Sequence, residues 1–219
     1  MDGKLDLRST RALPYFMIAL TIAIVFEMIG IMFDIMTDDF MLTAEYFIFS
    51  FVVGLYFCSY RLSARFKWMQ YASVMFMCYV LISVFDNVFL WVYHLTDSYM
   101  PLFVISEIAS SVPDVFLILG IGFLLRCVME EYKTMGKKSE SEKSGKLLRL
   151  WIIAQLADMI VIDMMLDLNN VMGHHTSSTT FIIVMATAIL YTVTLVWICV
   201  RIRKFSYDVY MDYYNRRGR

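Results

Sequence analysis

Acidic side chains lie inside long apolar stretches of this chain, where a carboxylate is costly unless something balances it. A charged side chain deep in hydrocarbon costs about 2.5–3.5 kcal/mol on insertion scales. No lysine or arginine lies at comparable depth to neutralise these acids. Each must therefore be protonated, hydrogen-bonded, exposed to water in a cavity or bound to a cation. The acids within or at the edges of the apolar stretches are Glu27, Asp34, Asp86, Glu107, Asp114, Asp158, Asp163 and Asp167.

The spacing of these acids places them on helix faces that carry other polar residues. At about 100° per residue, Glu107, Ser111 and Asp114 share one face of a helix, and Glu27 shares a face with Asp34. Two further stretches have comparable polar stripes, one made of Tyr79, Ser83, Asp86 and Tyr93 and the other of Thr180, Thr187, Tyr191 and Thr194. In the stretch over residues 150–172, Asp163, Asp167 and Asn170 share a face. Gln155 lies at the margin of that face, and Asp158 lies off it. The stripes predict a shared polar interior.

Two kinds of chemistry fit such an interior. Burial raises the pKa of a carboxyl group, so a set of buried acids can bind a cation or exchange protons near neutral pH. Alternatively, polar side chains and protonated acids hold membrane helices together without any ligand, each contributing about 0.6–2 kcal/mol. The predicted binding or transport set is Glu27, Asp86, Glu107, Asp114, Asp163 and Asp167.

The three histidines, His94, His174 and His175, lie at or beyond the ends of apolar stretches. Imidazole and carboxylate ligands suit zinc, iron or nickel, so these residues are the candidates for a metal site. A histidine pKa near 6.5 also suits the sensing of pH. An ordinary polar loop is the competing interpretation of the adjacent His174 and His175.

Composition identifies the elements that must position these residues. The chain of 219 residues is 60% hydrophobic and only 18% charged, which is too little polar surface for a water-soluble globule. Six apolar stretches are long enough to cross a bilayer as helices. They run over residues 13–35, 44–60, 68–94, 102–126, 150–172 and 180–200. The sequence therefore predicts an all-α bundle of six transmembrane helices.

The basic residues predict the orientation of this bundle. All 19 lysines and arginines fall in four segments, namely residues 1–12, 61–67, 126–149 and 201–219, and the other three connections contain none. Cytoplasmic segments carry the excess of basic residues. We therefore expect a multi-pass protein of the plasma or cytoplasmic membrane, with both termini in the cytoplasm.

The expected domains are an N-terminal cytoplasmic tail (1–12), the transmembrane domain (13–203) and a tyrosine-rich cytoplasmic tail (204–219). Residues 130–147 are rich in Lys, Glu, Ser and Gly without apolar periodicity, which predicts a solvated, mobile linker. The tail is expected to form a short interfacial helix or to fray. An offset of 59 residues aligns Val25-Phe26-Glu27 with Val84-Phe85-Asp86, which raises the alternative of three related helical hairpins.

The segment Ser110-Ser111-Val112-Pro113-Asp114 resembles the start of a helix, although it falls inside an apolar stretch. A helix broken there would direct its free N–H groups into the bundle, as discontinuous transporter helices do. A simple proline kink is the alternative, and it is the one we expect.

No phosphate-binding loop, zinc-protease motif or hydrolase nucleophile motif occurs, so no cofactor is indicated. The first hypothesis is a small permease or channel for a cation or a proton-coupled solute. The second is a membrane sensor or assembly subunit that signals to a protein partner through the cytoplasmic loop and tail. A homo-oligomer is a further alternative. An intramembrane enzyme based on paired aspartates such as Asp86 and Asp163 is a third class. The lipid bilayer is the expected environment, and no nucleic-acid partner is expected.

Overall fold

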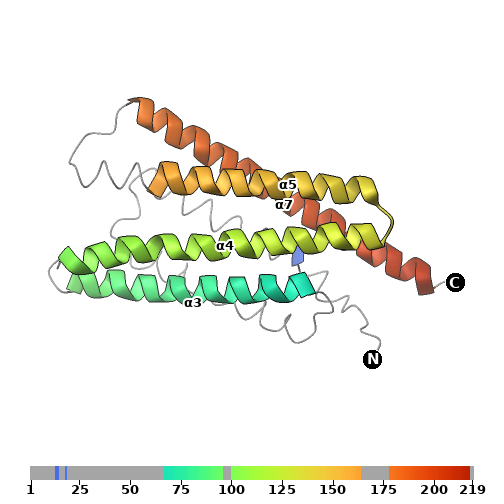
Figure 1. Ribbon diagram of the computed structural model, residues 1–219, viewed down its shortest axis with the longest axis horizontal. Coiled ribbons are helices and arrows are strands. Elements are labelled where there is room, and N and C mark those ends of the chain that lie inside the picture. The colour runs from blue at the N-terminus through green and yellow to red at the C-terminus, as the bar shows by residue number, and fades with distance from the viewer. Residues whose placement is uncertain (1–12, 15–17, 19–66, 96–99, 164–177, 218–219) are drawn as a thin grey trace. The chain divides into compact units, whose positions relative to one another are not determined.

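The computed structural model describes residues 13–14, 18, 67–95, 100–163 and 178–217, and each regular element within these ranges is helical (Figure 1). The elements are α3 (Lys67–Leu95), α4 (Met100–Thr134), α5 (Lys138–Asp158), the π-helical turn η1 (Met159–Asp163) and α7 (Ser178–Arg217). The predicted all-α class is therefore confirmed for the described residues. Apart from residues 13, 14 and 18, the first two apolar stretches lie outside them.

Two described helical stretches, Val112–Thr134 and Ile182–Asp212, are long and apolar enough to cross a bilayer. Helix α3 begins and ends within one residue of the predicted limits 68 and 94. Helix α7 has 40 residues, which at 1.5 Å per residue gives about 60 Å, twice the thickness of a hydrocarbon core. The last apolar stretch and residues 204–217 of the tail therefore form one continuous helix, without fraying in this described part.

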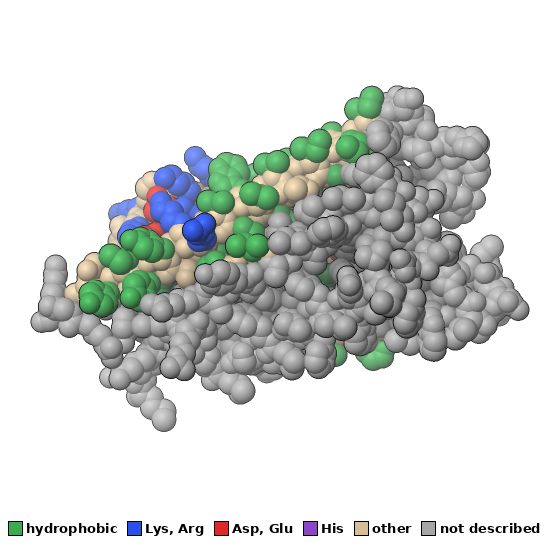
Figure 2. Space-filling view, turned by 180° about the vertical axis from the view of Figure 1, so that it is seen from behind, with side chains coloured by type: hydrophobic (Ala, Val, Ile, Leu, Met, Phe, Trp, Pro, Cys, Tyr) green, Lys and Arg blue, Asp and Glu red, His purple; other side chains and the backbone are tan. Residues whose placement is uncertain are grey.

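Along each described helix, one end exposes charged or polar side chains and the rest exposes apolar ones. On α7 every exposed side chain from Ile182 to Val200 is apolar, and the charged Arg203 and Lys204 follow. Figure 2 shows hydrophobic side chains along α7 and a gathering of Lys, Arg and acidic side chains toward its C-terminal half. On the other helices the change falls between Gln70 and Leu81 (α3), between Leu119 and Arg126 (α4) and between Arg149 and Ile152 (α5).

The chain divides into two compact units, and the first comprises Ile29–Phe123. Within it, α3 packs against the first part of α4. Phe76 is fully buried, and a Cβ atom at Gly120 would lie 3.1 Å from Cζ of its ring, so this close approach depends on glycine. Trp68 stacks on Phe123 with ring centroids 5.8 Å apart.

The second unit comprises Met1–Met28 and Leu124–Arg219, in which α5 lies against α7. Trp151 of α5 is fully buried, and its ring centroid lies 5.5 Å from that of the buried Tyr191 of α7. Further toward the C-terminus, the ring of Phe205 packs edge-on against Tyr132 at the end of α4, with centroids 5.6 Å apart. The last turns of α4, helix α5 and the second half of α7 thus share one core.

A tight turn joins α4 to α5 in place of the expected irregular linker. Gly136 has a φ of +76°, which favours glycine, and it follows the last residue of α4 by two positions. The Lys137 N–H donates to the Tyr132 carbonyl (2.9 Å) and the Gly136 N–H to the Lys133 carbonyl (3.0 Å). These two bonds form a Schellman cap, which satisfies the last carbonyls of α4 and reverses the chain.

The prediction of a non-helical linker over residues 130–147 is wrong, because α4 continues to Thr134 and α5 begins at Lys138. The first turns of α5 bury Ser141, Ser144 and Leu147 ahead of Trp151, at helical spacing. Two of the buried residues are serines, so the segment shows no apolar periodicity although one of its faces is covered.

Helix α4 is continuous through Pro113. The alternative of a helix broken inside the apolar stretch is therefore wrong, and a proline within an unbroken helix is what the structure contains.

Candidate functional site

The structure describes only part of the predicted acidic set. Positions 86, 107 and 163 lie on helices, but their side chains, like that of His94, are outside the described residues. Glu27, Asp167, His174 and His175 lie wholly outside the described ranges. Within those ranges, no three His, Cys, Asp or Glu side chains come together as a metal site requires. Asp114 is the member of the set whose surroundings are defined.

Asp114 lies at the head of a buried stripe on α4. It is half-buried, and Leu117 and Ile121, at three and seven residues further on, are 2% and 0% exposed. Because α4 is a continuous helix, positions 107 and 111 continue the same stripe toward its N-terminus. The exposed residues Val115 and Leu119 lie on the other side of the helix. The polar stripe predicted on α4 therefore continues the face that this helix buries.

Helix α3 gives a similar result for position 86. Tyr79 is 3% exposed, and position 86 lies seven residues later, which is two turns further along the same face. Leu81 and Phe85, on other faces of the helix, are 54% and 62% exposed. Position 86 thus lies on the same face of α3 as Tyr79, and this face is buried in the protein at Tyr79.

The π-turn η1 changes the alignment of the acids on α5. In an α-helix residue i+4 comes round above residue i, whereas in a π-turn residue i+5 does so. Position 163 therefore lies above Asp158, on the side of the buried Gln155. Continued α-helix would have put position 163 on the side of Leu156 and Ile160, which are 49% and 58% exposed. The sequence-based placement of Asp158 away from the face of Asp163 assumes a regular α-helix, which does not continue through Met159–Asp163.

Gln155 provides a buried polar atom on this face. The residue is 1% exposed, and its Oε1 atom accepts no hydrogen bond from any described residue. A carbonyl oxygen is a ligand for hard cations and an acceptor for a protonated carboxyl group. The face shared by Gln155, Asp158 and position 163 therefore combines an amide oxygen with two carboxyl-bearing positions.

A second polar cluster, which the sequence analysis does not predict, surrounds Arg201 of α7. The Arg201 cluster consists of Arg201, Glu140, Ser144 and Tyr132. Arg201 is 7% exposed, and its Nε donates to Ser144 Oγ at 2.9 Å. Its two terminal nitrogens donate to the side chain and to the backbone carbonyl of Glu140. The guanidinium carbon lies 4.9 Å from the centroid of the Tyr132 ring, within the range of a cation–π contact.

Glu140 joins Arg201 to two further bases. Its carboxylate lies 3.1 Å from Lys143 Nζ and 3.0 Å from Lys204 Nζ. The hydrogen bond from Arg201, followed by that from Lys204, lowers the pKa of Glu140 to about 2. Glu140 is therefore ionised at neutral pH and ties the first turn of α5 to α7.

The other end of Tyr132 connects α4 to the last part of α7. Its hydroxyl donates to Asp208 Oδ2 at 3.0 Å, and Lys137 Nζ lies 2.8 Å from Asp208 Oδ1. Tyr132 is fully buried. Its ring contacts Arg201, and its hydroxyl contacts Asp208. The contacts around Arg201 and Asp208 fasten three helix segments together.

From the sequence, Arg201 and Glu140 are expected only as charged residues outside the spans. One signal that could have revealed their roles is position, since Arg201 follows the last apolar stretch directly. Its neighbour Ile202 is 0% exposed and continues the buried stripe of α7, so an arginine at position 201 falls on a covered face. A buried arginine requires an acid close by.

Comparison of the chain with protein-family models, with curated proteins and with solved structures gives no match.

Proposed function

We propose that this chain is an integral membrane protein that crosses the bilayer six times and moves a cation, or a solute coupled to protons, by means of acids inside the membrane. The apolar exterior of the described helices supports the first part. On α7 the exposed apolar band from Ile182 to Val200 corresponds to about 28 Å of helix, close to the thickness of a hydrocarbon core.

The polar ends of the four described helices support the topology. They lie at the start of α3, the end of α4, the start of α5 and the end of α7, which are the ends that carry the basic residues. An excess of lysine and arginine marks the cytoplasmic side. The remaining spans and the cytoplasmic location of both termini follow from the same rule applied to the sequence.

The observation that carries the transport proposal is the buried stripe on α4 that begins with acids. Asp114 heads this stripe, and the face of α3 at position 86 continues the buried Tyr79. Acids on inward faces, with no base at their depth in the sequence, bind a proton or a cation in order to remain in the membrane.

Flux into proteoliposomes tests this proposal. Purified protein is reconstituted with a pH-sensitive dye inside the vesicles, and gradients of sodium, potassium or protons are imposed. Wild-type protein should give flux above that of empty liposomes, and Asp114→Asn and Asp86→Asn should abolish it. Glu142→Gln, which removes an exposed acid of α5, is the matched control and should leave the flux unchanged. Unchanged flux in both aspartate variants would show that the acids serve only to hold helices together.

A sensor or assembly subunit is the second candidate, and the cytoplasmic end of α7 favours it. Tyr207 and Tyr214 are 63% and 67% exposed on a helix that the Arg201 cluster holds to α4 and α5. Exposed aromatic side chains on a rigid helix suit a protein partner. Recovery of a stoichiometric partner that is lost in Tyr207→Ser/Tyr214→Ser, together with no flux by the purified protein, would favour this function over transport.

A further inference from the structure

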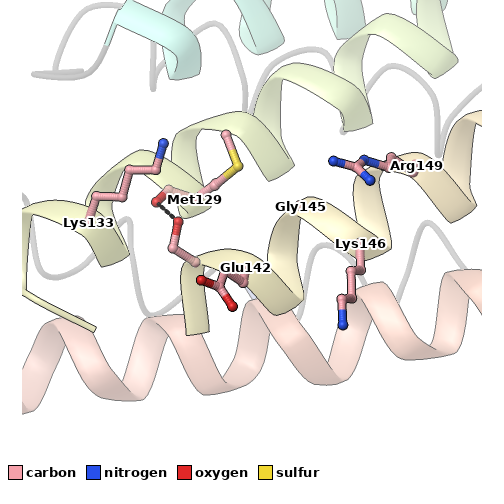
Figure 3. Close-up of a pocket in the computed structure, with 7 residues that line it drawn as sticks. Met129, Lys133, Glu142, Gly145, Lys146 and Arg149 are labelled. Carbon is pink, nitrogen blue, oxygen red and sulfur yellow. Dashed lines mark hydrogen bonds between the residues drawn. The ribbon is translucent and has the colours of Figure 1, made fainter. Parts of the chain in front are cut away.

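A basic pocket lies between α4 and α5, away from the acidic faces. It has a volume of about 370 Å³ and three bases against one acid, and it is lined by Met129, Lys133, Ser141, Glu142, Gly145, Lys146 and Arg149. Figure 3 shows Lys133 and Arg149 on either side of Met129, while Glu142 and Lys146 extend away from them. A Cβ atom at Gly145 would lie 3.4 Å from Met129 Sδ, so α5 passes close to this side chain of α4 here.

The three bases of this pocket lack the acids that neutralise other bases nearby. Glu140 pairs with Arg201, Lys143 and Lys204, and Asp208 pairs with Lys137. Within the described ranges, Lys133, Lys146 and Arg149 take part in no ion pair. Unpaired bases from two helices, gathered around one pocket, attract an anion with several oxygen acceptors, such as a phosphate group.

The exposed face of α5 continues from these bases into an apolar stripe. Lys146 and Arg149 are followed at spacings of three and four by Ile153, Leu156 and Ile160, which are 59%, 49% and 58% exposed. Residues at these spacings share one helix face. The stripe therefore changes from basic to apolar within one turn, as a charged headgroup and its hydrocarbon chain require. A soluble anion would use the bases but not the apolar residues.

We propose that this pocket and the adjoining stripe of α5 bind one anionic phospholipid of the cytoplasmic leaflet. The phosphate lies between Lys133 and Arg149, Lys146 adds to the positive potential, and an acyl chain follows Ile153, Leu156 and Ile160. Basic pockets between helices at the cytoplasmic surface are suited to anionic headgroups. The inference rests on the proposed membrane location, but it does not depend on transport.

Native mass spectrometry of the full chain in neutral detergent measures this binding directly. The probes are phosphatidylglycerol and phosphatidylcholine with identical acyl chains, and inorganic phosphate as a competitor. Wild-type protein should retain phosphatidylglycerol in preference to phosphatidylcholine. Lys133→Gln/Arg149→Gln should weaken the binding of phosphatidylglycerol roughly thirtyfold, given the contribution of each base near an anionic surface.

Two further variants separate this site from general electrostatics and from a site for soluble anions. Lys138→Gln/Arg203→Gln removes two exposed bases that do not line the pocket, and it should cost much less affinity. Ile153→Ser/Leu156→Ser should weaken the binding of both lipids, and inorganic phosphate should not displace phosphatidylglycerol.

Equal losses in the two double variants of basic residues would overturn the proposal. So would full displacement of the lipid by inorganic phosphate, which would indicate a site for a soluble anion. If the basic double variant does not fold, the single variants Lys133→Gln and Arg149→Gln replace it and should each show part of the loss. The measurement involves no flux, so failure of the transport proposal leaves it intact. Extraction of cell membranes with alkaline carbonate tests the membrane location separately.

Discussion

Replacement of Glu140 by glutamine tests the Arg201 cluster, because it removes one charge while keeping the size and shape of the side chain. A pKa of about 2 instead of 4.5 corresponds to at most about 3 kcal/mol of stabilisation at neutral pH. The side chains of Lys143 and Lys204 are 61% and 49% exposed, so water screens their share of this energy. We therefore expect Glu140→Gln to lower the free energy of unfolding by about 1–2 kcal/mol at pH 7.

The same stabilisation should depend on pH in a defined direction. The pKa of Glu140 is lower in the folded protein than its ordinary value of 4.5, so ionised Glu140 stabilises the fold above pH 4.5. This contribution is lost as the pH falls from 4.5 toward 2, because the carboxylate becomes protonated. The difference in stability between wild-type protein and Glu140→Gln should therefore be largest at neutral pH and should vanish only as the pH falls below 2.

Thermal unfolding in detergent, followed by tryptophan fluorescence, measures this difference. For a chain of this length, 1–2 kcal/mol corresponds to a decrease in Tm of roughly 2–8 °C. Glu142→Gln is the matched control, since Glu142 is exposed two residues away and forms no ion pair with any described residue. Equal Tm values for Glu140→Gln, Glu142→Gln and the wild type at pH 7 would refute the stabilising role assigned to this carboxylate.

Two further predictions concern the packing of each unit. Tyr132→Phe removes the hydroxyl that donates to Asp208 at 3.0 Å, and it should lower the free energy of unfolding by about 1–2 kcal/mol, whereas Tyr207→Phe on the exposed side of α7 should have no effect. Gly120→Val places new carbon atoms against the buried ring of Phe76 and should cost about 1–3 kcal/mol. Phe76→Leu in the same chain should recover part of that loss, and strict additivity in the double-mutant cycle would contradict the contact.

The extent of the helices could be predicted from the sequence wherever apolar residues cover all faces. Helix α3 matches its predicted limits within one residue, and the exposed apolar band of α7 ends at the predicted boundary, Val200. An apolar run of this length is a direct signal, since both lipid-facing and protein-facing sides contribute to it. The polar extension of α7 beyond Arg203 gives no such signal, and its helix is stabilised by Phe205 and Asp208 contacts with α4.

The start of α5 could not be predicted because its buried face is made of small polar residues. Ser141 donates to the Met129 carbonyl and Ser144 to the Glu140 carbonyl, both within hydrogen-bonding distance, and neither contributes to hydrophobic periodicity. This face is buried against Arg201, which donates a hydrogen bond to Ser144 and lies 57 residues beyond it in the chain. Local sequence patterns do not contain that information.

For the candidate acidic site, too, one feature could be predicted from the sequence and another could not. The continuity of the stripe from Asp114 to Ile121 on α4 follows from helical spacing alone, and the buried residues of α4 agree with it. The alignment of Asp158 with position 163 depends on the π-turn η1, for which no residue type is diagnostic. A regular helix is the only geometry that spacing can assume, so an inserted residue changes the predicted face.

The unbroken helix α7 has a mechanical consequence. It contains neither glycine nor proline, and the hydrogen bonds of Arg201, part of the way along its length, hold it to α5. From Ser178 to Arg201 the rod measures about 35 Å, and from Arg201 to Arg217 about 24 Å. A tilt about that fulcrum moves the two tips in opposite directions in a ratio of about 3 to 2. When the Ser178 end of α7 moves sideways, the tyrosine-rich C-terminal end therefore moves in the opposite direction by a somewhat smaller distance.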